Sequence, residues 1–342
     1  MSNSSFYLWG NCILTYGYKN SLIIDLQNNN QISIFNEFIE KKNNSKRIKK
    51  IIHNYLIKNS FGYISKENLN YRPISLEWNY PFHISQLTIE FFDIHNIEIL
   101  IKKITNYNID CILFEFIDYN FNYIKNCIKI IQSNKIQSIQ LNFKNLNIIY
   151  LKKILQVFMN YNLTHIYINN SFNSIEKIQN TLIINYDKIP EINFIINRLF
   201  FTESIQFNPS FNRKFFIDNK LNIKNHKNDS KSEFYINSIN GSLLNLSNNK
   251  LFTQLWYANK TKIRICKNCE FKNICSDSRL PIHTKNNNWY YSSECNYNPY
   301  IAKWKGEEGY KTLAECGVIS NENGFSIDHD KIAEINKELW GE

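Results

Sequence analysis

Apolar segments that alternate with amphipathic segments are the feature that most constrains the fold of this chain. The intervening stretches 120–131 and 147–159 repeat apolar residues every three or four positions, which is the period of a helix. Strands and helices that alternate at this length favour parallel pairing through right-handed crossovers. The sequence therefore predicts an α/β fold. Its four apolar segments, about 26 residues apart, span residues 86–92, 111–117, 136–143 and 163–168.

The number of strand–helix units predicts an open arrangement. Further strands are expected at residues 181–185 and 214–218, which gives five or six units over roughly 150 residues. A closed eight-stranded barrel takes about 250 residues. We therefore expect residues 76–235 to form a partial (β/α) barrel. Within them, residues 219–232 (NKLNIKNHKNDSKS) contain few apolar side chains and predict a mobile surface loop.

Residues 1–75 predict a small N-terminal α+β module. Short strands are expected at 12–16 and 21–26, followed by an asparagine-rich turn and a third apolar stretch. Helical patterns follow at 36–42 and 46–58. This element order resembles a winged helix, although it also fits an extension of the next domain. At the other end of the chain, Asp328 predicts the N-cap of a helix that runs to Trp340.

Five of the eight cysteines lie within 51 residues, in the pattern C-x2-C-x5-C-x19-C-x20-C. Four thiolates suit either a [4Fe-4S] cluster or a structural zinc ion. Zinc ribbons usually offer two C-x2-C pairs and this chain has one, but the spacing alone leaves both metals open. The segment 236–342 is thus predicted to be a metal-binding domain. Its cysteines are Cys266, Cys269, Cys275, Cys295 and Cys316.

The surroundings of these cysteines fit a buried metal. Seven aromatic residues between 271 and 304 are expected to shield the site from water. Nearby cations are expected to offset the thiolates and to lower the thiol pKa values. His283 is expected to lie at the surface or behind the ligands, and Cys12, Cys111 and Cys127 are expected to pack in cores. The cations considered are Lys262, Arg264, Lys267, Lys272 and Arg279.

Other features narrow the class of protein. The first ten residues lack a signal-peptide pattern and no stretch approaches about 18 uninterrupted apolar residues, so we expect a cytoplasmic protein that has no membrane partner and keeps its thiols reduced. The net charge of +10 comes with an abundance of Asn, Ile and Lys typical of A/T-rich coding sequence. We expect no nucleic-acid partner, because no nucleic-acid-binding signature is present. No phosphate-binding glycine loop is present either.

The stretches CKNCEFKNICSDSRLP, ECNYNPYIAKWKGEEGYKTLAECG and GNCILTYGYKNSLIIDLQ resemble the SPASM-domain peptide maturase of grasp-with-spasm systems. The resemblance covers nearly the whole chain. It implies a degenerate radical-SAM-like partial barrel, a C-terminal SPASM domain and one [4Fe-4S] cluster. Cys316 is the spare candidate for the fourth ligand. The ligands carried over from the family pattern are Cys266, Cys269, Cys275 and Cys295.

The chain departs from the family pattern in two ways. Arg279 stands where the wider family has a further cysteine, and no cysteine lies between Cys127 and Cys266, so a second cluster is not expected. The C-x3-C-x2-C triad of radical SAM enzymes is also absent before Cys266, as is a Gly-Gly pair. We therefore expect no S-adenosylmethionine cofactor and no SAM cleavage.

The resemblance also implies partners. In such systems an ATP-grasp ligase forms ester or amide crosslinks in a ribosomally made precursor peptide. The chain is then expected to recognise the precursor or hold the ligase, or to perform a redox step, and whether it is an enzyme stays open. The N-terminal module is expected to bind the leader of the precursor as an added strand. The alternative is a zinc-stabilised interaction protein without redox activity.

Overall fold

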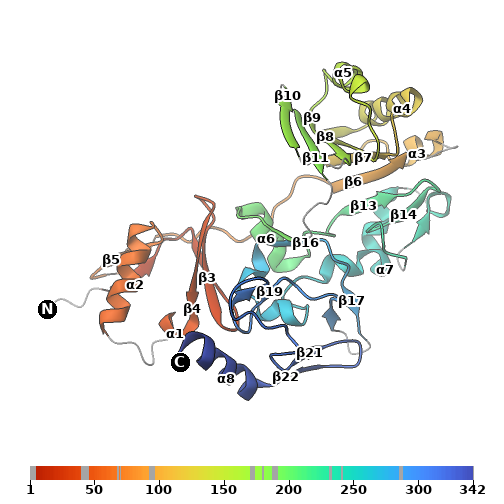
Figure 1. The fold of residues 1–342 in the computed structure, drawn as a ribbon. Coiled ribbons are helices and arrows are strands. Elements are labelled where there is room, and N and C mark those ends of the chain that lie inside the picture. The colour runs from red at the N-terminus through yellow and green to blue at the C-terminus, as the bar shows by residue number, and fades with distance from the viewer. Residues whose placement is uncertain are drawn as a thin grey trace. The chain divides into compact units, whose positions relative to one another are not determined.

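The computed structural model describes residues 5–39, 46–67, 69, 71–91, 97–169, 174–178, 181–186, 192–230, 233–239, 242–284 and 288–341. It is a mixed α/β structure that divides into two compact units (Figure 1). The cysteine unit comprises residues 1–79, 192–209 and 258–342, and the sheet unit comprises residues 80–191 and 210–257. The helices described in these units are all too short or too polar to span a bilayer.

A nine-stranded sheet dominates the sheet unit, in the order β10-β11-β9-β8-β7-β6-β13-β14-β15. The six strands from β11 to β13 in this order are parallel to one another, and the three others pair antiparallel. Within the described residues β10 and β15 each pair on one side only, so the sheet is open. The strands are β6 Ile84–Phe91, β7 Asn108–Phe116, β8 Lys135–Phe143, β9 Leu163–Asn169, β10 Ser174–Ile178, β11 Thr181–Tyr186, β13 Lys214–Ile217, β14 Asn222–Lys224 and β15 Phe234–Tyr235.

Three helices connect the consecutive parallel strands: α3 (Ile97–Lys103), α4 (Phe121–Gln132) and α5 (Ile148–Val157). Because β6, β7, β8 and β9 follow one another across the sheet, right-handed crossovers place these helices on one face. Asn120 and Asn147 cap α4 and α5 by accepting from backbone N–H groups two residues on. The predicted α/β class and its four recurring strands are confirmed.

The core of the sheet unit lies under these helices. In β7, the buried residues Ile112, Phe114 and Phe116 alternate with half-buried ones, as expected for a strand with one covered face. The ring of Phe116 stacks between Phe91 and Phe143 of the adjacent strands, with centroid distances of 5.6 and 4.8 Å. This row of rings ties three parallel strands together.

One expectation for this unit is wrong. Residues 219–232 were predicted as a mobile loop, but they contain β14, and Leu221 and Ile223 are 4% and 0% exposed. Asn225, also buried, donates to the carbonyl oxygens of Phe211 and Lys214 at 2.8 Å. The polar composition of this segment suggested a loop. Two buried apolar residues are nevertheless enough to hold a short strand when the polar side chains beside it form hydrogen bonds with backbone groups. Residues 231 and 232 lie outside the described part.

The N-terminal part of the cysteine unit has the predicted order of three strands and two helices. The sheet β2-β3-β4 is antiparallel, and α2 has its predicted bounds. Helix α1 ends at Ile39 within the described residues, whereas we expected it to reach Lys42, which the structure does not describe. The antiparallel pair β1–β5 was not expected. The elements are β1 Ser5–Leu8, β2 Cys12–Tyr16, β3 Asn20–Asp25, β4 Asn30–Phe35, α1 Asn36–Ile39, α2 Lys46–Lys58 and β5 Gly62–Ser65.

A hydrophobic core of the cysteine unit joins this N-terminal module to the cysteine-rich segment. Leu22, Ile24 and Leu26 pack with Phe201 and Ile274, which come from distant parts of the chain. The two units therefore do not follow the three segments 1–75, 76–235 and 236–342, whose division stays a prediction. The remaining helices and strands are β12 Ile192–Phe194, α6 Arg198–Gln206, α7 Lys250–Thr253, β16 Cys275–Asp277, β17 Ile282–His283, β18 Trp289–Tyr290, β19 Tyr297–Asn298, β20 Lys303–Trp304, β21 Val318–Ser320, β22 Phe325–Ile327 and α8 His329–Trp340.

The C-terminal helix α8 is confirmed in its bounds and its cap. Asp328 accepts from the backbone N–H of Lys331 at 3.0 Å. Ile332 and Ile335 are buried in a core cluster and Leu339 packs against it, as the predicted apolar face requires. The helix thus fastens the end of the chain onto the cysteine unit.

Candidate metal centre

The first three cysteines of the clustered pattern, Cys266, Cys269 and Cys275, lie in or just after a compact loop. This loop consists of two 3-10 turns, Ile265–Asn268 and Glu270–Asn273. Cys269 donates its backbone N–H to the carbonyl oxygen of Cys266 at 3.0 Å, so these residues are one tight turn apart, as predicted. Cys275 opens strand β16, which pairs antiparallel with β12. The local fold thus returns a third thiol toward the first two.

The hairpin between β2 and β3 supports this cysteine loop. Tyr18 donates its N–H to the carbonyl oxygen of Asn268 at 2.7 Å, and the Lys272 ammonium donates to the carbonyl oxygen of Tyr16. A Cβ atom at Gly17 would lie 2.7 Å from the nitrogen of Glu270, so only glycine allows this approach. The N-terminal module therefore supports the cysteine loop, a role that the sequence did not predict.

Glu270 lies fully buried behind the loop. One of its carboxylate oxygens accepts from the hydroxyl of Tyr297, and the other has no hydrogen-bond partner in the part of the chain that the structure describes. Burial raises the pKa of this carboxyl to about 7, although the Tyr297 hydrogen bond opposes the shift. Phe271, Tyr297 and Trp304 pack with one another beside it, with ring centroids 4.7 to 6.0 Å apart, so part of the predicted aromatic shield forms.

The four predicted ligands lie in one electrostatic neighbourhood. The charges of Cys266 and Cys295 both influence the pKa of the Cys275 thiol, and those of Cys266 and Cys275 influence the pKa of Cys269. Burial raises the pKa of Cys266 to about 11 and that of Cys275 to about 12, and it also raises those of Cys269 and Cys295. We expected lowered pKa values, and this expectation is wrong for the metal-free thiols because desolvation outweighs the nearby cations.

A buried charge network lies beside the thiols. Lys260 and Asp277 have side chains 2% and 1% exposed, and their Nζ and Oδ2 atoms are 3.0 Å apart. Arg279 binds the same carboxylate through two nitrogens, at 3.0 and 2.7 Å. Lys260 also donates to the hydroxyl of Tyr291 at 2.8 Å. Two cations against one carboxylate leave a net positive charge, and both cations lower the pKa of Cys266.

Sequence analysis identified only part of this network. Arg279 was expected near the thiols, but Lys260 was not, because nothing in the run ANKTK distinguishes a buried lysine from a solvated one. Arg264 has a different role, since it donates to the carbonyl oxygens of Asn321 and Gly324 at 2.6 Å and so holds the turn between β21 and β22. Lys272 lies close enough to Cys269 to interact with its charge.

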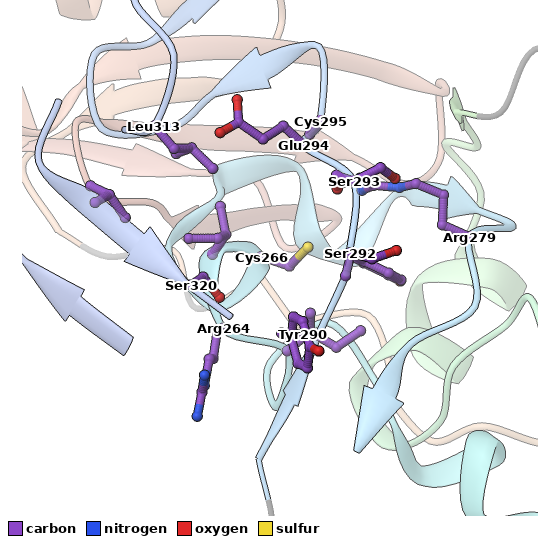
Figure 2. A pocket seen from close by; sticks show the side chains of 14 residues that line it. Arg264, Cys266, Arg279, Tyr290, Ser292, Ser293, Glu294, Cys295, Leu313 and Ser320 are labelled. Carbon is purple, nitrogen blue, oxygen red and sulfur yellow. Dashed lines mark hydrogen bonds between the residues drawn. The ribbon is translucent and has the colours of Figure 1, made fainter. Parts of the chain in front are cut away.

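A cavity of about 160 Å³ opens beside two of the predicted ligands. Figure 2 shows the Cys266 sulfur among the side chains that line it, with the segment from Ser292 to Cys295 along one wall. Arg279 closes the cavity near Ser293, to whose carbonyl oxygen it donates at 2.6 Å. Cys266 and Cys295 thus face a common space, although they are 29 residues apart in the chain.

The other cysteines have different surroundings. Cys316 is fully buried in the core cluster under α8, and the Asn298 side chain donates to its sulfur at 3.3 Å. Its placement favours Cys295 as the fourth ligand. Cys12 and Cys127 are 8% and 0% exposed, which confirms their predicted packing in cores.

The expectations for Cys111 and His283 have separate outcomes. Cys111 is half-buried, so the prediction that it packs in a core is only partly right. Burial raises the pKa of its thiol. His283 is exposed and its ring packs edge-on against Trp289, as expected for a surface histidine.

Among the residues described, no three His, Cys, Asp or Glu side chains stand in a metal-coordinating arrangement. A metal at these cysteines, and its identity, therefore stay predictions that rest on the chemistry of the donor set. Comparison of the chain with protein-family models, with curated proteins and with solved structures found no match.

Proposed function

We propose that this protein matures a ribosomally made peptide and carries one [4Fe-4S] cluster in a SPASM domain. The cluster would be held by the four thiols of Cys266, Cys269, Cys275 and Cys295. In this proposal the sheet unit is a degenerate, radical-SAM-like partial barrel that does not cleave S-adenosylmethionine, and an ATP-grasp ligase forms the bond in the precursor. The protein acts in the cytoplasm, where thiols stay reduced.

The observation that carries the proposal is the buried charge network beside the thiols. A buried lysine and arginine that share one carboxylate provide net positive charge where four thiolates would otherwise repel one another. A bound cluster would supply one-electron chemistry or a rigid crosslink between loop segments. The chain's own part is to keep the four thiols together and water out. Zinc suits the same donors, which gives the alternative of an interaction protein without redox activity.

The N-terminal module supports the peptide part of the proposal. Strands β2 and β4 each pair only with β3 among the described residues, so the module has strand edges that could accept an extended peptide. Its hairpin contacts the cysteine loop directly, through the bond between Tyr18 and Asn268. A peptide added to this sheet would therefore be held on the element that supports the metal centre.

Metal analysis tests the proposal first. Anaerobically purified protein is expected to contain about four irons and four sulfides per chain and to absorb visible light. Cys269→Ser should lose the metal and lower the thermal unfolding midpoint of the cysteine unit. Cys127→Ser, which removes a fully buried thiol of the sheet unit, should keep full metal content.

The outcomes separate the alternatives. One zinc per chain without sulfide would show that the cysteines hold a structural zinc ion and no iron-sulfur cluster. Full metal content in Cys269→Ser would overturn the ligand assignment. The peptide role is tested with the ligase and its precursor, by measuring the loss of water that accompanies each new bond. Bond formation at the same rate without this protein would contradict the role in maturation.

A further inference from the structure

A surface patch outside the metal centre forms where β7 and β8 lead into α4 and α5. Asn145 donates its N–H to the carbonyl oxygen of Ile117 at 2.7 Å, which holds the two connections side by side. The rings of Tyr119 and Tyr150 stack across them, 4.4 Å apart and inclined by 6°. We call this surface the crossover patch; it comprises Ile117, Tyr119, Phe121, Ile149 and Tyr150.

The crossover patch exposes large apolar side chains at the carboxyl edge of the parallel strands. Ile117 is 45% exposed, Phe121 50% and Ile149 68%. Clustered exposed apolar residues on a soluble surface mark contact sites for other molecules, whereas single ones need no explanation. In open α/β sheets, ligands commonly bind at the carboxyl ends of the strands.

The rim of the crossover patch is positively charged. The Lys125 ammonium lies 4.6 Å from the centroid of the Phe121 ring, and that of Lys153 lies 5.7 Å from the centroid of Tyr150. Lys144 follows β8 and Lys152 lies on α5 beside Lys153, whereas the acidic residue between 117 and 153 is Asp118. A partner for this surface therefore needs negative charge around apolar side chains.

The packing of the rings favours a peptide over a nucleic acid. Bases bind single-stranded sites by stacking on free aromatic faces. Here Tyr119 and Tyr150 already stack on each other, and Lys125 covers Phe121. Beside the half-exposed ring of Phe121, the patch offers outward the aliphatic surface of Ile117 and Ile149. A second copy of this chain would bring the same lysines to the contact, which costs free energy through like-charge repulsion.

We propose that the crossover patch binds an acidic segment of peptide that contains aliphatic side chains. This inference rests on the proposed function, in which the chain handles a precursor peptide, and it places a second contact for that peptide on the sheet unit. Glutamate or aspartate carboxylates would face Lys125 and Lys153. A leucine, isoleucine or valine side chain would pack on Ile117 and Ile149.

Fluorescence anisotropy with the full-length protein tests the proposal. The probe is a fluorescein-labelled peptide of alternating Glu and Leu, compared with Lys–Leu and Glu–Ser peptides of equal length. We expect the Glu–Leu peptide to bind and both others to bind at least about tenfold more weakly, equivalent to about 1.4 kcal/mol each. If the Lys–Leu peptide binds equally well, the patch does not select for negative charge. If the Glu–Ser peptide binds equally well, the patch does not select for aliphatic side chains.

Matched variants locate the site. Ile149→Ser and Lys153→Glu should each raise the Kd for the Glu–Leu peptide about tenfold or more. Controls on the same two connections are Met159→Ser, which removes a side chain 69% exposed beyond the end of α5, and Lys129→Glu in the last turn of α4. Both controls should bind like the unchanged protein. Equal losses in variants and controls would mean that the peptide binds elsewhere, which rejects the patch.

Two further readings complete the test. A single-stranded RNA probe that binds more tightly than the peptide and is weakened by Ile149→Ser would assign the patch to nucleic acid. Concentration-dependent dimerisation that Ile149→Ser abolishes would assign it to a second copy. All variants should keep the metal content of the unchanged protein, because the patch belongs to the sheet unit. Failure of peptide binding with normal metal content and ligase dependence would reject this inference alone.

Discussion

Lys260 shows how one residue acquires its role from its surroundings. Its ammonium is almost fully buried, and desolvation by burial lowers its pKa, but interactions with Tyr291, two of the thiols and the ionised Asp277 leave that pKa raised on balance. The lysine therefore stays charged beside the candidate ligands. Arg279, which binds the same carboxylate, completes the network.

Replacing Lys260 by methionine tests that network. Removing one partner of a buried ion pair lowers the free energy of unfolding by about 3 kcal/mol. Arg279 still pairs with Asp277 in this variant, so the carboxylate is not left as an unpaired buried charge. We expect Lys260→Met to lower the unfolding midpoint of the metal-free protein and to reduce the metal retained after dialysis against a chelator. Lys305→Met, at an exposed position of the same unit, is the control and should change stability by less than about 0.5 kcal/mol. Equal metal retention in both variants would contradict the charge-balancing role.

At the scale of elements, the β3–β4 hairpin depends on Asp25. Its carboxylate accepts from the side chain of Asn11 at 2.6 Å and from the N–H groups of Gln27 and Asn28 at 2.9 and 3.0 Å. Burial raises the pKa of Asp25, but these bonds and a further one from the Asn28 side chain outweigh burial and leave the pKa below its ordinary value. The turn that begins at this residue is therefore closed by an ionised group.

The sign of the resulting pH dependence follows from linkage. A carboxyl whose pKa is lowered on folding stabilises the protein above its unfolded pKa, about 3.9, and loses that contribution as the pH falls further. We expect urea unfolding to show stability falling more steeply from pH 5 to pH 3 in the unchanged protein than in Asp25→Asn. Near pH 7 the variant should be less stable by about 1 to 2 kcal/mol. Asp118→Asn, at an exposed position, controls for the loss of one charge. If the free energy of unfolding falls equally steeply with pH in all three proteins, the prediction is wrong.

The positions of helices and strands could be predicted from the sequence where a periodic apolar pattern extended over many residues. The strands of the sheet unit and helices α2 and α8 match their predicted bounds closely because each carries several apolar residues on one face. Short elements were missed, among them β14 and the pair β1–β5. Two to four residues hold no recognisable period, so their pairing depends on partners distant in the chain.

At the scale of the whole molecule, the cysteine unit is assembled from three separate stretches of chain. Leu22, Ile24 and Leu26 are buried against Phe201 and Ile274, and burying one such side chain is worth about 1.5 to 3 kcal/mol. A protein that begins at Tyr80 should therefore expose this core, bind the dye ANS and lose its near-UV circular dichroism in part. If that shortened protein stays monomeric, binds no ANS and retains the full metal content, the N-terminal module is independent of the metal centre.

The sequence by itself determined the α/β class, the parallel strands, the N-cap of α8 and the set of cysteines that could bind a metal. These properties depend on local spacing, because the periods of strands and helices and the reach of a tight turn are set by the backbone. Only the tertiary structure decided that Lys260 is buried, that Cys316 belongs to a core, and that Gly17 lets a hairpin contact the cysteine loop. Each of these depends on residues brought together from distant parts of the chain, and burial and desolvation are consequences of that assembly.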